Sequence, residues 1–118
     1  MIIDDDADLG VLLITALEKR KIHALAVQSL PEAEGFLAFM KPTFIFLDNN
    51  FPEGLGINFI RNIKSSDREI IIIMMTADPA PWIEEKAMEE GANYFLRKPF
   101  PSAAIDGMLE ALNYKTTV

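Results

Sequence analysis

The chain has 118 residues, of which 50% are hydrophobic and 25% charged, a composition that suits one globular domain spanning residues 1–118. Its net charge of −7 argues against direct nucleic-acid contact, since phosphate backbones require a basic surface, and the absence of cysteine excludes disulfides and thiolate metal sites. No apolar run reaches the ~20 residues of a membrane helix and no signal peptide is visible, so we expect a cytoplasmic protein without membrane contact.

Five short apolar runs alternate with five helical patterns, the signature of a parallel sheet with crossover helices. Strands are predicted at residues 1–3, 22–28, 43–47, 70–75 and 93–96. Helices are predicted at 7–20, 31–40, from Ile57 past Ile63, from Pro81 to a cap at Gly91, and from an N-cap at Ser102 to about 113. The sequence therefore predicts an α/β fold.

Two strand patterns carry further information. The run 70–75 is β-branched with no polar break, which indicates a strand inside the sheet that is covered on both faces. The run 1–3 is shorter than the ~5 residues of a usual interior strand, and the sequence leaves open whether the natural first strand begins earlier.

Polar residues follow four of the predicted strands. They are Asp4, Asp5 and Asp6 after the first strand, Asp48 after the third, Thr76 after the fourth and Lys98 after the fifth. Because chemistry collects at the carboxyl ends of the strands in an open α/β sheet, we expect these side chains to converge. A hard divalent cation such as Mg²⁺ would relieve the repulsion between the carboxylates, although the acidic turn alone is better explained as a solvated N-cap.

Asp48 favours the metal site over the solvated N-cap, because it follows four apolar residues of a predicted buried strand. A lone carboxylate there would be costly, whereas a neighbouring metal ion and ammonium would stabilise it and leave it a nucleophile toward phosphorus. Phosphoryl transfer needs mainly positioning and charge neutralisation, which Mg²⁺ and Lys98 can supply. The Thr76 hydroxyl can hydrogen-bond a phosphoryl oxygen.

Together these residues resemble the receiver domain of two-component response regulators, the family of the chemotaxis response regulator. The matching motifs are Asp4-Asp5, Leu47-Asp48 followed by Pro52 and Gly56, Thr76-Ala77, Gly91-Ala92, and Lys98-Pro99-Phe100. The resemblance covers nearly the whole chain. It implies a flavodoxin-like, doubly wound five-stranded parallel sheet of order 2-1-3-4-5 with five helices.

The resemblance also implies a role for each site residue. Asp48 would be the phosphoacceptor, and Thr76 and Lys98 would contact the phosphoryl group. The Lys98-Pro99 bond is expected to be cis.

A Mg²⁺ ion is the implied cofactor. Asp5, Asp48 and the backbone carbonyl of Asn50 would bind it directly, and Asp4 would assist through water.

Thr76 and Phe95 would form the switch, with Phe95 in place of the commoner tyrosine; plain core packing explains Phe95 equally well. The readout would be the face made by the fourth helix, the fifth strand and the fifth helix, which could also form a homodimer. The implied partner is a histidine kinase or a phosphotransfer protein.

Two other functions remain open. A Mg²⁺-dependent phosphatase of the haloacid-dehalogenase type would also use an aspartyl-phosphate, but it typically has a second aspartate two residues on, where this chain has Asn50. A receiver-like interaction module independent of phosphorylation would have no need of Asp48, Thr76 and Lys98 together. The sequence names neither the cognate kinase, the input nor the output.

Overall fold

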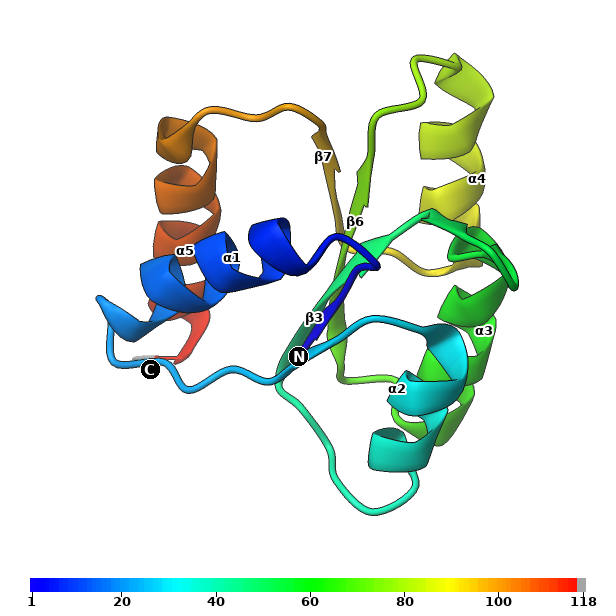
Figure 1. Cartoon of the computed structure of the whole chain (residues 1–118), viewed down its shortest axis with the longest axis horizontal. Helices are drawn as coiled ribbons and strands as arrows, with labels where there is room; N and C mark the ends of the chain where they lie inside the picture. The colour runs from blue at the N-terminus through cyan, green and yellow to red at the C-terminus, as the bar shows by residue number, and fades with distance from the viewer. Residues whose placement is uncertain (117–118) are drawn as a thin grey trace.

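The computed structural model describes the backbone of residues 1–116 and the side chains of residues 1–112. Five parallel strands form one sheet in the order β2-β1-β3-β6-β7, and five helices flank it (Figure 1). The strands are β1 Ile2–Ile3, β2 Ala26–Val27, β3 Phe44–Asp48, β6 Ile71–Thr76 and β7 Tyr94–Arg97. The helices are α1 Ala7–Glu18, α2 Leu30–Leu37, α3 Ile57–Ser66, α4 Pro81–Glu90 and α5 Ser102–Thr116. This is the predicted doubly wound fold.

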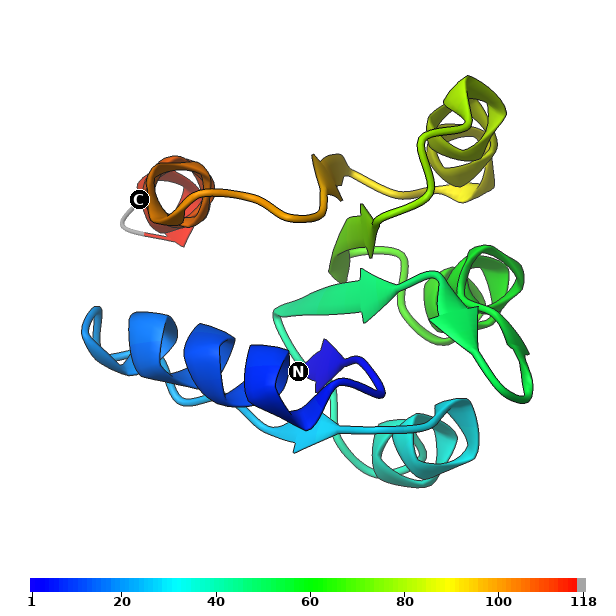
Figure 2. The ribbon, with the colours of Figure 1, turned by 45° about the horizontal axis from the view of Figure 1, so that its top comes forward.

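The sheet is the middle of three layers, with α1 and α5 on one face and α2, α3 and α4 on the other (Figures 1 and 2). Successive side chains of a strand point to opposite faces, so each strand contributes side chains to the core on both faces of the sheet. Ile45 and Leu47 of β3 pack in the cluster with α2, α3 and α4, whereas Phe46 packs in the cluster with α1 and α5. Burial on both faces explains why the interior strands β3 and β6 are apolar up to their last residue.

Strand β6 confirms the prediction of an interior strand. It pairs with β3 on one side and β7 on the other, and Ile72 and Ile73 are fully buried. Its register with β3 places Asp48 beside Met75 and brings the ends of the two strands to the same edge.

The predicted strand 22–28 is much shorter in the structure. Only Ala26 and Val27 pair, because β2 is an edge strand whose sole neighbour, β1, offers just Ile2 and Ile3. Because β2 has no second neighbour to pair with, the short β1 limits its paired length.

Two further differences concern a loop and a helix start. The predicted loop after Asp48 contains a small antiparallel hairpin, β4 Asn50–Phe51 and β5 Gly54–Leu55. Helix α5 begins at Ser102 itself, so the prediction that Ser102 caps the helix from outside is wrong. Within residues 1–116, no helix is long and apolar enough to cross a membrane.

Candidate functional site

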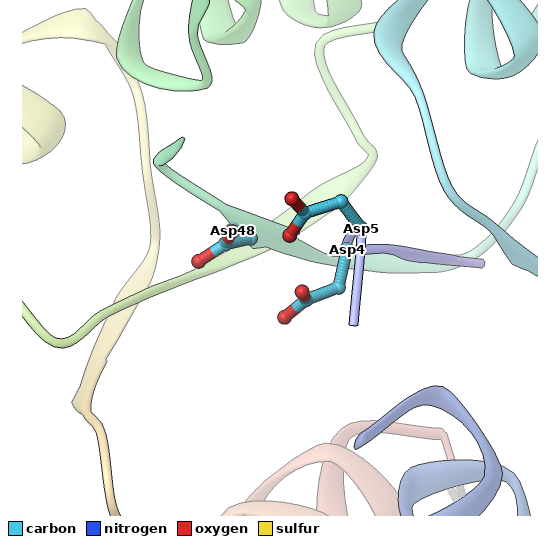
Figure 3. A group of neighbouring side chains, drawn as sticks. All are labelled: Asp4, Asp5 and Asp48. Carbon is cyan, nitrogen blue, oxygen red and sulfur yellow. The ribbon is translucent and has the colours of Figure 1, made fainter. Parts of the chain in front are cut away.

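The carboxylates that follow β1 and end β3 lie together at one edge of the sheet (Figure 3). Ile3 pairs with Leu47, so the residues that follow them, Asp4 and Asp48, leave neighbouring strands side by side. One oxygen each of Asp4, Asp5 and Asp48 lies within 4.8 Å of the others. Asp4 and Asp48 are buried, whereas Asp5 is exposed.

Lys98 brings the positive charge to this cluster from the end of β7. Its Nζ donates hydrogen bonds to Asp4 Oδ2 at 2.7 Å and to Asp48 Oδ1 at 3.0 Å. Its backbone N–H donates to the Thr76 carbonyl at 2.8 Å, and its bond to Pro99 is cis. One ammonium thus holds two buried carboxylates.

The charges around this ammonium shift two pKa values. Burial raises the pKa of Asp48; the hydrogen bond from Lys98 opposes this, and the nearby charge of Asp4 adds to the rise. Burial lowers the pKa of Lys98, but hydrogen bonds and charges from Asp4 and Asp48 outweigh it, so the net change is upward. Asp48 therefore sits where a further cation would favour its charged form.

The donor set fits a hard divalent cation. Mg²⁺ takes oxygen ligands at ~2.0–2.1 Å, so two oxygens on one ion lie at most about 4 Å apart. The three carboxylates need only a small side-chain movement to meet that limit. Asn50, the fourth expected ligand, lies two residues past Asp48 as the exposed first residue of β4.

Thr76 and Phe95 occupy the other side of this edge. Thr76 is fully buried at the end of β6, and its Oγ1 accepts a hydrogen bond from the backbone N–H of Asp78 at 3.1 Å. Phe95 of β7 is half-buried against the core cluster of α2, α3 and α4. The structure thus places every expected site residue at or near the carboxyl edge of the sheet.

The sequence reasoning missed Asn49, which holds the loop that carries Asp48. Asn49 is 1% exposed, and its Oδ1 accepts a hydrogen bond from the Ile57 N–H at 3.0 Å. This bond caps α3, because the N-cap residue Gly56 has no side chain to do so. Its backbone also bonds Met75 and Gly56. The signal was a polar residue directly after a buried run, which needs partners.

We expect Asn49→Ala to lower the free energy of unfolding by about 1–2 kcal/mol, because it removes a helix cap and leaves a buried N–H unpaired. Urea denaturation measures this loss. Asn58→Ala, which removes an exposed asparagine from the first turn of α3, is the control and should stay close to wild type. An alanine variant as stable as wild type would contradict a capping role.

Comparison with known proteins identifies this arrangement. Residues 1–110 match the response regulator receiver domain family. The chain belongs to this family. It is 29% identical over 118 residues to the phosphate regulon transcriptional regulatory protein PhoB of Pseudomonas aeruginosa, a match that covers 98% of this chain and 52% of PhoB. The chain thus spans about half the length of the curated relatives that it matches.

Solved structures agree on the receiver fold. The beryllofluoride-activated NtrC4 receiver domain dimer superimposes with a TM-score of 0.87 and 29% identity, covering 93% of this chain and 91% of that one. A two-component response regulator from Clostridium difficile gives a TM-score of 0.91 at 24% identity, covering 99% of this chain and 96% of that one. The fold of this receiver domain is therefore shared with these two structures.

Proposed function

We propose that this receiver domain accepts a phosphoryl group on Asp48, from a histidine kinase or a phosphotransfer protein, in a Mg²⁺-dependent reaction. The observation that carries the proposal is the placement of Asp48. Its carboxylate is buried at a strand end, 3.0 Å from the Lys98 ammonium. One of its oxygens lies within 4.8 Å of an oxygen of Asp4 and one of Asp5, close enough for the three to bind one metal ion.

In the proposed reaction, an Asp48 carboxylate oxygen attacks the phosphorus of a phosphohistidine. A P–O bond forms as the P–N bond breaks, and the imidazole nitrogen keeps the electron pair. Hydrolysis later breaks the same P–O bond and returns inorganic phosphate and the free carboxylate. Lys98 stays beside the attacking carboxylate and offsets the charge on the transferring oxygens.

The contacts of the three acids support different roles at the metal, with Asp4 acting through water and Asp5 and Asp48 binding directly. Asp4 already has protein partners on both oxygens, the Asp6 N–H at 2.9 Å and Lys98 Nζ at 2.7 Å, which suits a role through water. Asp5 is exposed, and among the described residues its carboxylate accepts no hydrogen bond, which suits direct binding together with Asp48. When bound, Mg²⁺ would neutralise charge on the transferring phosphoryl group.

The proposed signal passes through Thr76 and Phe95 to the face of α4, β7 and α5. Thr76 Oγ1 would leave Asp78 to bind a phosphoryl oxygen, and Phe95 would then turn inward. The NtrC4 relative is described as a dimer in its beryllofluoride-activated form, which supports a homodimer of the activated state. For this chain we propose the face of α4, β7 and α5 as the dimer surface. The receiver domain would thus store the phosphoryl group as a signal.

Two observations weigh against the alternatives. A phosphatase would need a second acid two residues past Asp48, where the structure has the exposed Asn50. A module independent of phosphorylation gains nothing from burying Asp4 and Asp48 together, because that cluster requires Lys98 to be tolerable.

The test is incubation with Mg²⁺ and a small phosphodonor such as acetyl phosphate, followed by intact-mass analysis. We expect one phosphoryl group per chain, lost with a chelator and lost in Asp48→Asn. Asp106→Asn, an exposed carboxylate on α5, is the matched control and should behave as wild type. No adduct on the wild-type chain would favour the interaction module, and sustained turnover of the donor would favour the phosphatase.

A further inference from the structure

Arg97 of β7 links three separate parts of the molecule. Its NH1 donates a hydrogen bond to the Asp78 carbonyl in the β6–α4 loop at 3.0 Å. Its NH2 lies 3.5 Å from Glu84 Oε1 on α4, and its guanidinium sits 5.1 Å from the centre of the Phe95 ring. Among the described residues, no other side chain makes a hydrogen bond, ion pair or cation–π contact with all three.

The loop that Arg97 holds is also the loop that holds Thr76. Asp78 donates its backbone N–H to Thr76 Oγ1 at 3.1 Å, while its carbonyl accepts from Arg97. In the sheet, Arg97 is the β7 partner of Thr76, and in the chain it precedes Lys98. The backbone of Asp78 therefore links the Thr76 hydroxyl to the Arg97 guanidinium.

We propose that Arg97 is a positioning residue that holds the β6–α4 loop and Phe95 in the unphosphorylated arrangement. The inference rests on the proposed function, in which Thr76 must leave Asp78. When Thr76 Oγ1 moves toward a phosphoryl oxygen, Asp78 loses the hydrogen bond that ties its N–H to the end of β6, and the loop must shift. Arg97 then loses its hydrogen bond to the Asp78 carbonyl. Its ion pair with Glu84 and its cation–π contact with Phe95 weaken as a result.

The expected size of the effect follows from exposure. The side chains of Arg97 and Glu84 are 42% and 51% exposed, so their ion pair contributes little. The charged hydrogen bond to Asp78 and the contact with the aromatic ring carry most of the coupling. Removing both should shift the equilibrium about fivefold toward the activated arrangement, at the low end of allosteric couplings.

The test is a titration with beryllofluoride in the presence of Mg²⁺. Trp82, the only tryptophan, is exposed in the first turn of α4, four residues past Asp78, and its fluorescence reports the loop. We expect Arg97→Ala to bind beryllofluoride about fivefold more tightly than wild type, with Arg97→Lys in between. Arg68→Ala, which removes an exposed arginine before the other end of β6, should match wild type.

Thermal unfolding distinguishes positioning from simple support. A merely structural Arg97 would lower the melting temperature equally with and without beryllofluoride. We expect Arg97→Ala to gain a larger increase in melting temperature from the ligand than wild type does. Glu84→Gln, which keeps Arg97 and the loop bond, should show a smaller gain of the same sign.

The outcomes separate the two claims. A wild-type chain that neither binds beryllofluoride nor is stabilised by it would contradict the proposed function itself. A wild-type chain that binds, beside Arg97→Ala and Arg97→Lys variants that bind equally or more weakly, would overturn the inference about Arg97 alone.

Discussion

Replacing Gly56 by alanine should lower the free energy of unfolding by about 3 kcal/mol or more, although glycine usually gives way to alanine without harm in a helical conformation. Gly56 has φ −58° and ψ −34°, so its backbone alone would accept any residue. A Cβ there would lie 2.0 Å from the Asp48 carbonyl oxygen and 3.1 Å from the Asn49 Cα. Both atoms belong to the backbone, and the loop would have to move.

The displaced segment is the one that carries the proposed phosphoacceptor, so we expect Gly56→Ala to lose phosphoryl uptake as well as stability. Gly35→Ala is the matched control, because a Cβ at that position of α2 meets nothing within 4 Å. It should raise stability by about 0.5–1 kcal/mol. Chemical denaturation compares the two variants, and a Gly56→Ala chain as stable as wild type would show that the loop can relax.

Lys98→Met should be the most damaging single charge removal, at about 2–4 kcal/mol at pH 7. The side chains of Asp4 and Asp48 are 1% and 6% exposed, and Lys98 is the ammonium that both share. Without it, two buried carboxylates face each other unpaired. Lys86→Met removes an exposed lysine from its i,i+4 pair with Glu90, which keeps Arg61 as a partner. This control should cost about 0.5 kcal/mol or less.

The loss in Lys98→Met should depend on pH with a definite sign. The pKa of Asp48 is already above its ordinary value of 3.8, and removing the Lys98 hydrogen bond raises it further. A carboxyl with a raised folded pKa favours the folded state below its unfolded value and loses that contribution as pH rises through the folded one. Lowering pH from 7 toward 4 should therefore shrink the deficit relative to wild type.

Mg²⁺ should narrow the same deficit at pH 7, because it replaces part of the missing positive charge. Unfolding curves with and without Mg²⁺ measure this rescue. A Lys98→Met variant with wild-type stability and a wild-type pH profile would mean that the two carboxylates do not depend on the shared ammonium.

The fold was largely readable from the sequence because burial on both faces makes the interior strands β3 and β6 nearly continuous apolar runs. The unbroken apolar run 70–75 and the helical periodicity of 7–20 predicted interior strand β6 and helix α1. The number of paired residues in β2 could not be predicted. It depends on the length of β1, and no local pattern in residues 22–28 shows it. The hairpin after Asp48 was missed because its two strands have two residues each, too few to show a strand pattern.

The acidic cluster was predicted because strand ends of a parallel sheet meet at one edge, which gives spacing in the chain a meaning in space. The residues that hold the neighbouring loops in place were not predicted. Asn49 is hydrogen-bonded to α3, and Arg97 is hydrogen-bonded to the loop before α4. Each partner is fixed by tertiary packing rather than by sequence spacing, and only the structure reveals it.

The central claim is that Asp48 receives the phosphoryl group. The most direct measurement is to phosphorylate the chain with Mg²⁺ and acetyl phosphate, reduce the acyl phosphate with borohydride, and locate the modified residue by peptide mapping. We predict a single modification at Asp48 that disappears when Mg²⁺ is removed. Modification at Asp4 or Asp5 instead, or a chain that stays unmodified, would contradict the claim.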